Sequence, residues 1–336
     1  MPASIEDVAK LAEVSISTVS RVINRRDLVN DKTYARVQAA IRELGYRPNA
    51  FARGLMLRKS EIVGLVLPDL HGEFYSEIIR GANRQARKSG YNLLISSARD
   101  GDDSQSLLDA MQQRTLLDGV AVMVSEITDR IREVLTSFRL PYVVLDGDIN
   151  GTPHDSVLID QRGGAIALMR HLVRNRGARR VIFVGGLETN LDTIARHAAY
   201  RAVLREAGLP GAPEDTYYLD YEYETAYQLA RQKARDWAGP GHCVFAANDE
   251  MASGIVAAVT TAGLSVPGDL AVVGFDDTRV ARMTRPPLTT VRVPMAEMGA
   301  RAVELLCQRV AEPKREPMTV SLTPELVVRE SCGAAE

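Results

Sequence analysis

The chain has 336 residues, of which 46% are hydrophobic and 25% charged, a composition typical of a globular protein with a full core. At roughly 150 residues per domain, this length predicts about two domains. The formal net charge of −2 gives by itself no indication of a polyanionic partner. Residues 1–60, however, hold eleven Lys and Arg against six Asp and Glu, a net of +5, so the remaining residues carry −7. This asymmetry predicts that the N-terminal end meets a polyanion.

The cysteines and the lengths of the apolar runs indicate where in the cell the protein is found. Cys243, Cys307 and Cys332 are odd in number and form no CxxC pair, which argues against a disulfide framework and favours a reducing environment. The first ten residues, MPASIEDVAK, lack the basic start and apolar run of a secretory signal. No apolar stretch approaches the ~18–20 residues that cross a bilayer. We therefore expect a soluble, cytoplasmic protein with no membrane partner.

Residues 4–45 predict three short helices. Ser4 and Asp7 have the spacing of a helix N-terminal cap, and apolar residues follow at helical intervals. The third predicted helix covers about residues 31–44, with Asn30 as its cap. An all-α N-terminal domain is therefore expected.

The second of these helices lies in VSISTVSRVIN, residues 14–24. Val19, Val22 and Ile23 form its apolar stripe, which we expect to face the other helices. Its outer face carries Ile16, Ser17, Ser20 and Arg21. Two helices joined by a short turn, the second with a polar outer face, form the helix-turn-helix pattern. The pattern alone also fits a plain surface helix; the local charge of +5 favours contact with a DNA major groove, where Ser, Thr and Arg bind base edges or phosphates.

Residues 46–60, YRPNAFARGLMLRKS, form a basic connector. Pro48 ends the preceding helix, and Asn49 can begin a short new helix that runs to Leu57. Gly54 weakens that helix by ~1 kcal/mol relative to Ala. We expect a marginal helix that needs a partner in order to form.

From residue 61 onward, apolar runs alternate with helical segments. The runs are IVGLVLPD, YNLLIS, GVAVMV, YVVLD, VIFVGG, CVFAAND and LAVVGFDD. Because they are continuously apolar, they predict strands buried on both faces of parallel sheets. Polar residues at their ends are candidates for ligand contacts, because ligands bind at the carboxyl ends of the strands in open α/β sheets. Two similar α/β halves are visible, at about 61–160 and 162–290.

The run IEDVAKLAEVSISTVSRVIN, followed by VNDKTYARVQAAIRELGYRPNAFARGLM and IVGLVLPD, resembles the lactose/galactose repressor (LacI/GalR) family of bacterial transcriptional regulators over essentially the whole chain. The resemblance implies a homodimer on a near-palindromic operator, with the connector folding into a hinge helix that wedges Leu55 into the minor groove. The alternative for Leu55 is a core contact within the N-terminal domain. The residues implied in DNA binding are Ser15, Ile16, Ser17, Thr18, Ser20, Arg21, Asn24, Asn30, Tyr34, Asn49, Ala52, Arg53 and Leu55.

The body is similar to the periplasmic sugar-binding-protein fold, in which two Rossmann-like lobes close on a ligand. The resemblance implies effector contacts from carboxylates, an arginine, an amide and aromatic rings, which suit a sugar or a sugar derivative. These contacts are Asp69, Phe74, Tyr75, Asp146, Arg196, Tyr221, Asn248 and Asp249, with Arg196 and Asp249 the strongest candidates. Asp276 and Asp277 are expected to be structural, and Asp160 to organise the crossover between the lobes. Ala199 stands where family members usually have glycine, a change in packing near the expected pocket.

The resemblance also sets the expected domain boundaries. We expect a helix-turn-helix domain over 1–48, a hinge over 49–60 and an effector-binding core over 61–336. Within the core, one lobe would comprise about 61–161 and 291–322, and the other about 162–290 and 323–336. The tail ends at SCGAAE without leucine heptads, so a dimer is favoured over a tetramer.

Other classes of protein are less consistent with the sequence. The five histidines show no metal spacing, and neither a GxSxG elbow nor a Walker loop occurs, so we expect no enzyme, no metal and no cofactor. A solute-binding protein for a transporter would fit residues 61–336 but leaves the basic N-terminal end without a role. A regulator controlled by a partner protein, an activator, and a repressor that requires a corepressor all remain open. The prediction is an allosteric repressor of carbohydrate-utilisation genes.

Overall fold

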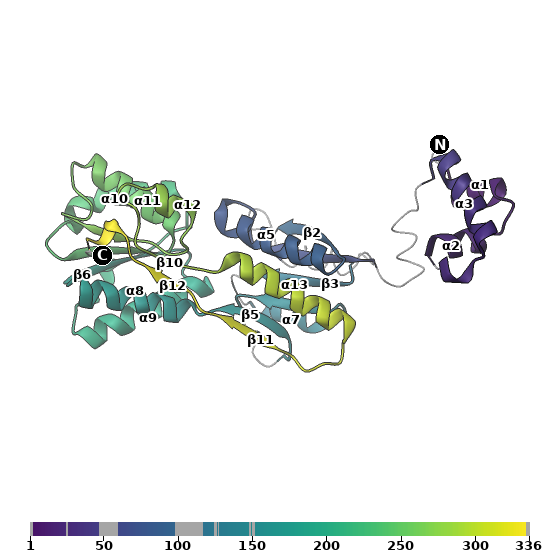
Figure 1. Cartoon of the computed structure of the whole chain (residues 1–336). Coiled ribbons are helices and arrows are strands. Elements are labelled where there is room, and N and C mark those ends of the chain that lie inside the picture. The colour runs from purple at the N-terminus through teal and green to yellow at the C-terminus, as the bar shows by residue number, and fades with distance from the viewer. Residues whose placement is uncertain are drawn as a thin grey trace. The chain divides into compact units, whose positions relative to one another are not determined.

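The computed structural model describes residues 3–24, 26–46, 60–97, 117–123, 126, 128–147, 149 and 152–333. The chain divides into two compact units, Met1–Glu61 and Ile62–Glu336, whose elements are labelled in Figure 1. Across these described residues, no helix is long and apolar enough to cross a membrane.

The first unit is all-α, as predicted. It contains α1 (Ile5–Leu11), α2 (Ile16–Asn24), a short 3-10 turn (Arg26–Leu28) and α3 (Asp31–Leu44). Its core is small and consists of side chains that the three helices turn toward one another. Val8, Ala9, Ala12, Val19, Val22, Val37 and Ala40 are buried in it.

The ends of these helices follow from local hydrogen bonds. The Ser4 hydroxyl accepts a hydrogen bond of 3.2 Å from the backbone amide of Asp7, and the Asp7 carboxylate accepts one of 2.8 Å from the backbone amide of Ser4. This reciprocal capping box begins α1 as the sequence predicts. Asn30 accepts from the Thr33 amide at 2.9 Å and begins α3. Glu13 adopts φ 49°, the left-handed conformation that lets the chain reverse in the short turn between α1 and α2.

The second unit is α/β and contains two parallel sheets, which confirms the predicted fold class. The larger sheet has the order β11-β5-β4-β3-β1-β2, and the other has the order β7-β6-β8-β9. All neighbours in both sheets are parallel. We call the part of the unit built on the larger sheet the first lobe and the part built on the other the second lobe. A short antiparallel pair, β10 and β12, lies beside them.

The strands have the following bounds. The first lobe contains β1 (Ile62–Leu67), β2 (Asn92–Ser97), β3 (Gly119–Met123), β4 (Tyr142–Leu145), β5 (Asp155–Ile159) and β11 (Thr319–Leu322). The second lobe contains β6 (Arg180–Gly185), β7 (Thr216–Tyr218), β8 (His242–Ala246) and β9 (Ala271–Val273). The antiparallel pair is β10 (Thr290–Arg292) and β12 (Glu325–Val327).

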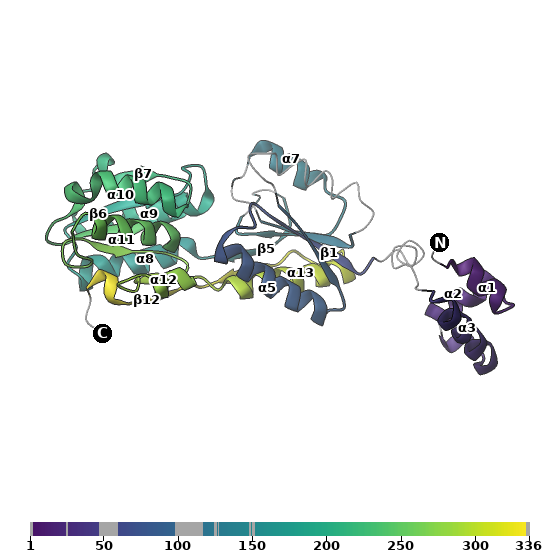
Figure 2. The ribbon, with the colours of Figure 1, turned by 90° about the horizontal axis from the view of Figure 1, so that it is seen from above.

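Helices cover both faces of the first lobe's sheet. In Figure 2, α5 (Gly72–Lys88) and α13 (Met295–Ala311) lie on one face and α7 (Asp129–Ser137) on the other. The helices α5 and α13 cross closely, because a Cβ on Gly81 would lie 1.8 Å from the Ala296 carbonyl oxygen. The strands are buried between these layers, as their apolar runs predict. The exceptions are the two edge strands: in β2, Leu94 is 41% exposed, and in β11, Thr319 and Ser321 are exposed.

The second lobe has the same layered form. Figure 1 shows α10 (Tyr223–Trp237) and α11 (Asp249–Thr261) on one face of its sheet, and α8 (Gln161–Arg170) and α9 (Leu191–Ala207) on the other. A π-helical turn (His171–Asn175) continues α8. A short helix, α12 (Arg279–Met283), packs against α11.

The chain passes between the lobes three times, after β5, after β10 and after β11. Asp160 lies at the first of these crossings, where its carboxylate accepts from the Gly163 amide at 2.8 Å and caps α8. Its own amide donates to the Leu322 carbonyl at 3.0 Å, which belongs to the third crossing. Asp160 therefore ties two crossings together, in agreement with the prediction.

Candidate functional site

The second helix presents the predicted polar face. Ile16 is 47% exposed, and Ser17 and Arg21 are exposed as well. Val19 and Val22 on its opposite side are buried. The α2 surface of Ile16, Ser17 and Arg21 is therefore free to reach a groove without loss of core contacts.

The start of α2 is organised by hydroxyl groups. The Ser15 hydroxyl accepts from the Thr18 amide at 3.2 Å and lies 2.8 Å from the Ser17 hydroxyl and 2.9 Å from that of Thr18. Helix N-termini with free amides and hydroxyls are contact points for phosphate oxygens. Ser20 is half-buried and lies one turn further along the same helix.

The remaining predicted DNA contacts are spread over other parts of the chain. Asn30 caps α3, and the Arg26 guanidinium lies over the Tyr34 ring at 4.1 Å, so both residues also have a structural role. Asn24 is the last residue of α2. The hinge residues Asn49, Ala52, Arg53 and Leu55 lie outside the described residues, and their predicted roles stay predictions.

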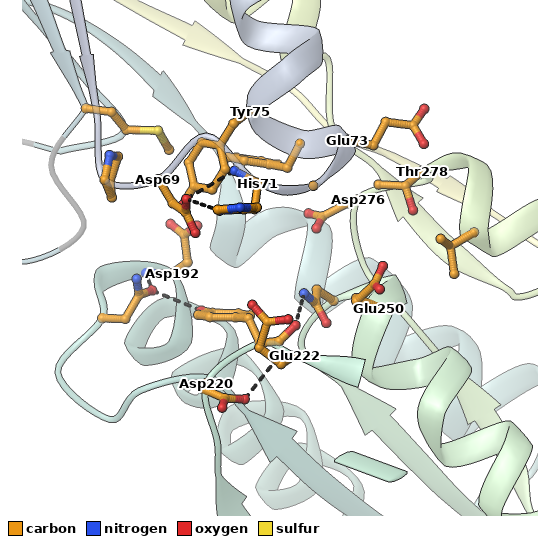
Figure 3. Close-up of a pocket in the computed structure, with 18 of the residues that line it drawn as sticks. Asp69, His71, Glu73, Tyr75, Asp192, Asp220, Glu222, Glu250, Asp276 and Thr278 are labelled. Carbon is orange, nitrogen blue, oxygen red and sulfur yellow. Dashed lines mark hydrogen bonds and ion pairs between the residues drawn. The ribbon is translucent and has the colours of Figure 1, made fainter. Parts of the chain in front are cut away.

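The second unit encloses a cavity of about 310 Å³ between its two lobes. The cavity lies at the carboxyl ends of strands from both sheets, where open α/β sheets bind ligands. Figure 3 shows side chains from the β1–α5 connection facing side chains from the second lobe across this space. Six predicted effector contacts line it, namely Asp69, Phe74, Tyr75, Asp146, Tyr221 and Asn248.

Hydrogen bonds hold several of these lining residues in place. Asn248 accepts from the Met251 amide at 2.9 Å, which caps α11, and donates to the Tyr221 carbonyl at 2.9 Å. The Tyr221 hydroxyl donates to Asn190 at 3.0 Å and lies 2.7 Å from the Thr193 hydroxyl. The wall of the cavity on the second lobe is thus fixed before any ligand enters.

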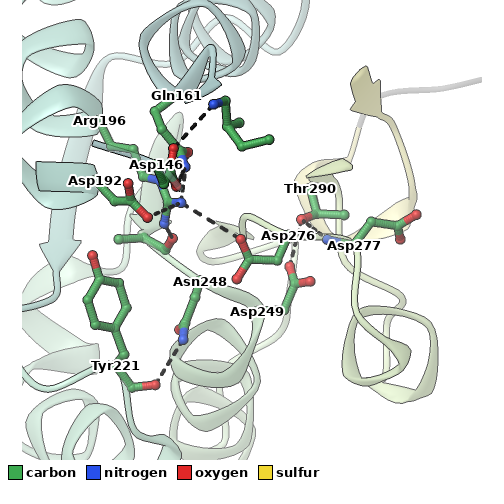
Figure 4. Close-up of polar contacts among 12 residues, drawn as sticks. Asp146, Gln161, Asp192, Arg196, Tyr221, Asn248, Asp249, Asp276, Asp277 and Thr290 are labelled. Atoms are coloured by element: carbon green, nitrogen blue, oxygen red, sulfur yellow. Dashed lines mark hydrogen bonds and ion pairs between the residues drawn. The ribbon is translucent and has the colours of Figure 1, made fainter. Parts of the chain in front are cut away.

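Arg196 lies behind this wall rather than in the lining. It is 2% exposed and donates to the Gln161 side-chain oxygen at 2.8 Å and to the Ala247 carbonyl at 2.6 Å. Its guanidinium also lies 3.3 Å from Asp192 and 3.8 Å from Asp276, as Figure 4 shows. Arg196 is therefore not among the residues that line the cavity, and its direct contact with a ligand stays a prediction. Arg196 instead positions two carboxylates that do line the cavity.

Asp249 is also placed behind the wall. It is 1% exposed, and its oxygens accept from the Thr290 hydroxyl at 2.6 Å and from the Thr278 amide at 2.8 Å. Burial raises the pKa of Asp249 to about 7. All its strong partners are within the fold, so the structure does not bring this predicted contact to the lining. Asp249 joins the start of α11 to the loop that carries Asp276.

Asp276 is the most informative residue that the sequence interpretation missed. We expected a structural role, but it lines the cavity with a side chain 9% exposed and an unusual φ of 110°. One of its carboxylate oxygens, Oδ1, has no hydrogen-bond partner. Asp277, by contrast, is structural as predicted, because it pairs with Arg292 at 2.8 Å and Arg329 at 2.5 Å.

Further polar residues also line the cavity. The sequence analysis did not select them, although most of them follow strand ends or begin helices, which is the signal that could have found them. They are His71, Glu73, Asn190, Asp192, Asp220, Glu222 and Glu250. Burial, and then the charge of Asp192, raise the pKa of Asp146 well above its usual value.

A small helix-turn-helix unit with an exposed polar second helix, joined to a two-lobed α/β unit with a cleft at its strand ends, defines a class of protein. It is the class of DNA-binding regulators with a ligand-binding body. The comparisons with known proteins agree with this assignment.

Residues 4–49 match the bacterial regulatory proteins of the lacI family, and residues 169–332 match the periplasmic binding protein-like domain. The HTH-type transcriptional repressor PurR of Yersinia pestis (strain Pestoides F) is 34% identical over 335 residues, which are 98% of this chain and 96% of the relative. The chain therefore belongs to the lacI family of bacterial regulatory proteins.

Solved structures show the same fold along the whole chain. A lac repressor dimer bound to operator and the anti-inducer ONPF has a TM-score of 0.88 at 27% identity, covering 99% of each chain. A complex of the transcriptional regulator CelR with cellobiose has a TM-score of 0.73 at 31% identity, covering 98% of this chain and 99% of the other.

Proposed function

We propose that this protein is a sequence-specific transcriptional repressor whose affinity for operator DNA is set by a small effector bound in the cleft. The observation that carries the proposal is the combination, in one chain, of an exposed recognition surface on α2 and a preformed cavity between two lobes. The relatives support it: PurR is named a transcriptional repressor, and the lac repressor was solved on its operator.

On the DNA side, α2 enters the major groove. Ile16 contacts a thymine methyl group, Ser17 a base edge, and Arg21 a guanine or a phosphate, according to the chemistry of these side chains. Asn49, Ala52, Arg53 and Leu55 form the hinge contacts, with Leu55 in the minor groove. A homodimer binds two half-sites of a near-palindrome, since operator symmetry mirrors protein symmetry.

On the effector side, the cleft takes a small hydroxyl-bearing molecule of the sugar class. Phe74, Tyr75 and Tyr221 supply apolar faces, and the carboxylates and amides of the wall accept and donate to hydroxyl groups. The complex of CelR with cellobiose supports this ligand class. The genes controlled would then be those for carbohydrate use, and the protein acts in the cytoplasm as a regulator rather than as an enzyme.

Effector and operator are coupled through closure of the lobes. A ligand that bridges the cleft changes how the lobes are held, and the two hinge segments of a dimer then lose or gain their joint fit to DNA. The coupling is reciprocal, so an effector that weakens operator binding must itself bind less well to the DNA-bound dimer by the same factor.

Fluorescence anisotropy on the full chain tests this proposal. Palindromic sequences from the gene's own promoter are titrated at physiological salt, with and without compounds that raise the melting temperature. We expect specific binding by a dimer and a change in operator affinity when the cleft is occupied. Binding of equal strength to all DNA sequences would overturn the proposal.

A further inference from the structure

The cavity between the lobes is strongly acidic. Of the nineteen described residues that line it, eight carry a carboxyl group, and none of the nineteen is a lysine or an arginine. Three acidic side chains, Asp69, Glu73 and Asp146, come from the first lobe. The other five come from the second lobe, so the acidic groups surround the space instead of lining one edge. They are Asp192, Asp220, Glu222, Glu250 and Asp276.

The positive groups near the cavity offset only part of this charge. His71 lies 2.8 Å from Asp69, and its ring carries a charge only when protonated. Arg196 contacts Asp192 and Asp276 from behind the wall. Glu73 accepts from a backbone amide, which neutralises no charge. Within the described lining, the carboxyl groups therefore outnumber the cations that reach them.

Asp276 lines the cavity, while its buried oxygen Oδ1, which has no hydrogen-bond partner, lies on the side of Arg196. Its side chain is 9% exposed, and the nearest cation, Arg196, is 3.8 Å away. Because Oδ1 is held on the Arg196 side, the other oxygen of this carboxyl group is the candidate acceptor for a ligand donor. Figure 3 shows its carboxylate facing the space between Tyr75 and Glu250.

The aromatic residues of the cavity lie among these carboxylates. Phe74 and Tyr75 pack edge to face with centroids 5.3 Å apart. Tyr75 lines the same cavity as Asp69 and Asp192, and burial, followed by the charges of Asp192 and Asp69, raises its pKa. Aromatic faces next to carboxylates are the environment that attracts an organic ammonium group.

A metal ion does not account for the acidic lining. Among the described residues, no three histidine, cysteine or acidic side chains are arranged to hold a metal. The carboxyl groups are spread around a space of about 310 Å³, at the lower end of the size of small-molecule pockets. Carboxyl groups spread around such a space suit an organic cation with several hydrogen-bond donors better than a point ion.

We propose that the effector is a hydroxyl-bearing molecule with at least one protonated amino group, such as an amino sugar, and that phosphorylated and carboxylated sugars are excluded. This inference rests on the proposed function, since it names the ligand class of the same cleft. The amine lies against Asp276 and the aromatic rings, while Glu222 and Glu250 at the exposed side attract the cation.

The test uses matched ligands on the full-length protein. Glucosamine, galactosamine and mannosamine are compared by thermal shift and calorimetry with the parent sugars and with the 6-phosphates. We expect at least one amino sugar to bind, its parent sugar to bind at least about tenfold more weakly, and none of the phosphates to bind. A phosphate that binds, a parent sugar that binds as tightly as its amine, or a panel without a binding amine would each overturn the inference.

Charge-neutral variants then locate the interaction. Glu222→Gln and Glu250→Gln alter exposed side chains, so the fold is retained. Each should weaken amino-sugar binding by about tenfold and reduce its dependence on salt. Glu224→Gln, an exposed change on α10 outside the lining, is the matched control and should leave binding unchanged. If all three variants change amino-sugar binding equally, Glu222 and Glu250 do not attract the ligand's amino group.

Failure of this inference can be told apart from failure of the proposed function. If a neutral or anionic sugar binds in the cleft and changes operator affinity, the repressor proposal stands, and the inference that the effector carries a protonated amino group is wrong. If an amino sugar binds as expected but operator affinity does not change, the charge inference stands and the effector proposal falls.

Discussion

The Glu73 carboxylate accepts a hydrogen bond of 2.7 Å from the backbone amide of Arg279, a residue 206 positions away in the sequence. Glu73 lies in the first turn of α5 in the first lobe, and Arg279 begins α12 in the second lobe. This hydrogen bond joins the lobes directly at the rim of the cleft. On its other side, the Thr189 hydroxyl donates to Glu126. These two polar contacts therefore link the lobes at the cavity, in addition to the three chain crossings.

Substitution of Glu73 by alanine should loosen this contact. Without the carboxylate, the Arg279 amide loses its acceptor, and α12 opens more often. Hydrogen–deuterium exchange of a peptide covering residues 278–284 should become faster by about tenfold, which corresponds to a contact of ~1.4 kcal/mol. Glu77→Ala is the control, because Glu77 lies on the same helix and pairs with Arg80 instead. Unchanged exchange in Glu73→Ala would show that the contact does not hold the lobes.

The two faces of α2 should respond differently to truncation. Val19 is fully buried, so Val19→Ala should lower the stability of the N-terminal unit by roughly 1–3 kcal/mol. Ile16 is 47% exposed, so Ile16→Ala should leave stability within about 0.5 kcal/mol of the parent. Circular dichroism melts of the full chain measure both effects.

Ile16→Ala should nevertheless lower the affinity for the operator. Loss of one base contact costs roughly 1–3 kcal/mol of specific binding while affinity for unrelated DNA stays the same. Anisotropy with operator and with scrambled DNA separates the two effects. An equal loss of affinity for operator and for scrambled DNA would show that Ile16 does not contact the bases.

Asp155 should be important for the stability of the first lobe. It is fully buried and accepts from Arg309 at 2.8 Å, from Arg315 at 2.7 Å and from the Met318 amide at 2.8 Å. Asp155→Ala would leave two mostly buried guanidinium groups without their partner, and we expect a loss of about 3–5 kcal/mol. Urea unfolding measures this change.

An exposed ion pair provides the comparison for Asp155. Arg301 and Glu304 lie 2.9 Å apart with side chains 47% and 40% exposed. Glu304→Ala should change the free energy of unfolding by less than about 1 kcal/mol, because water screens such pairs. A loss for Asp155→Ala no larger than that for Glu304→Ala would refute the central role of Asp155.

Asp249 should make stability dependent on pH. Its pKa is raised from 3.8 to about 7, so the folded state binds a proton more tightly than the unfolded state between these values. The contribution of Asp249 to stability is therefore lost as pH rises from about 4 to about 7, by up to about 4 kcal/mol. Above about pH 7, the contribution of Asp249 to the free energy of unfolding no longer changes with pH.

Asp249→Asn removes this titration. Unfolding monitored by the single tryptophan, Trp237, which is 1% exposed, should show a smaller difference between about pH 5 and about pH 8 in the variant than in the parent. The absolute stability of the variant is a separate quantity, since asparagine cannot accept from both Thr278 and Thr290. If the stability of Asp249→Asn and that of the parent protein depend on pH in the same way, Asp249 is not the group that titrates.

Much of the fold follows from patterns that the sequence displays locally. The capping box at Ser4, the cap at Asn30 and the apolar stripe of α2 depend on neighbours within four residues, and all three are present. The long apolar runs correctly predicted parallel strands, although β2 is not buried on both faces and exposes Leu94. Short strands such as β7 and β10 were missed, because three residues are too few to show periodicity.

The site was less predictable, because it depends on which side chains reach the surface of the cavity. Arg196 and Asp249 have the chemistry of ligand contacts, yet their hydrogen bonds are satisfied within the fold. Asp276 and Asp277 are adjacent in sequence, but a φ of 110° at Asp276 sends the two carboxylates to different environments. Neither outcome can be read from residue type or spacing, since both depend on contacts with segments distant in the sequence.

Reading of DNA sequence by the first unit is the central property that we propose for this protein. In vitro selection from a random double-stranded library, with the full-length protein at physiological salt, tests that claim most directly. The account predicts enrichment of an inverted repeat that binds two chains and whose specific affinity falls in Ile16→Ala. Selected pools without a common sequence, or enriched sites that Ile16→Ala binds as tightly as the parent, would contradict it.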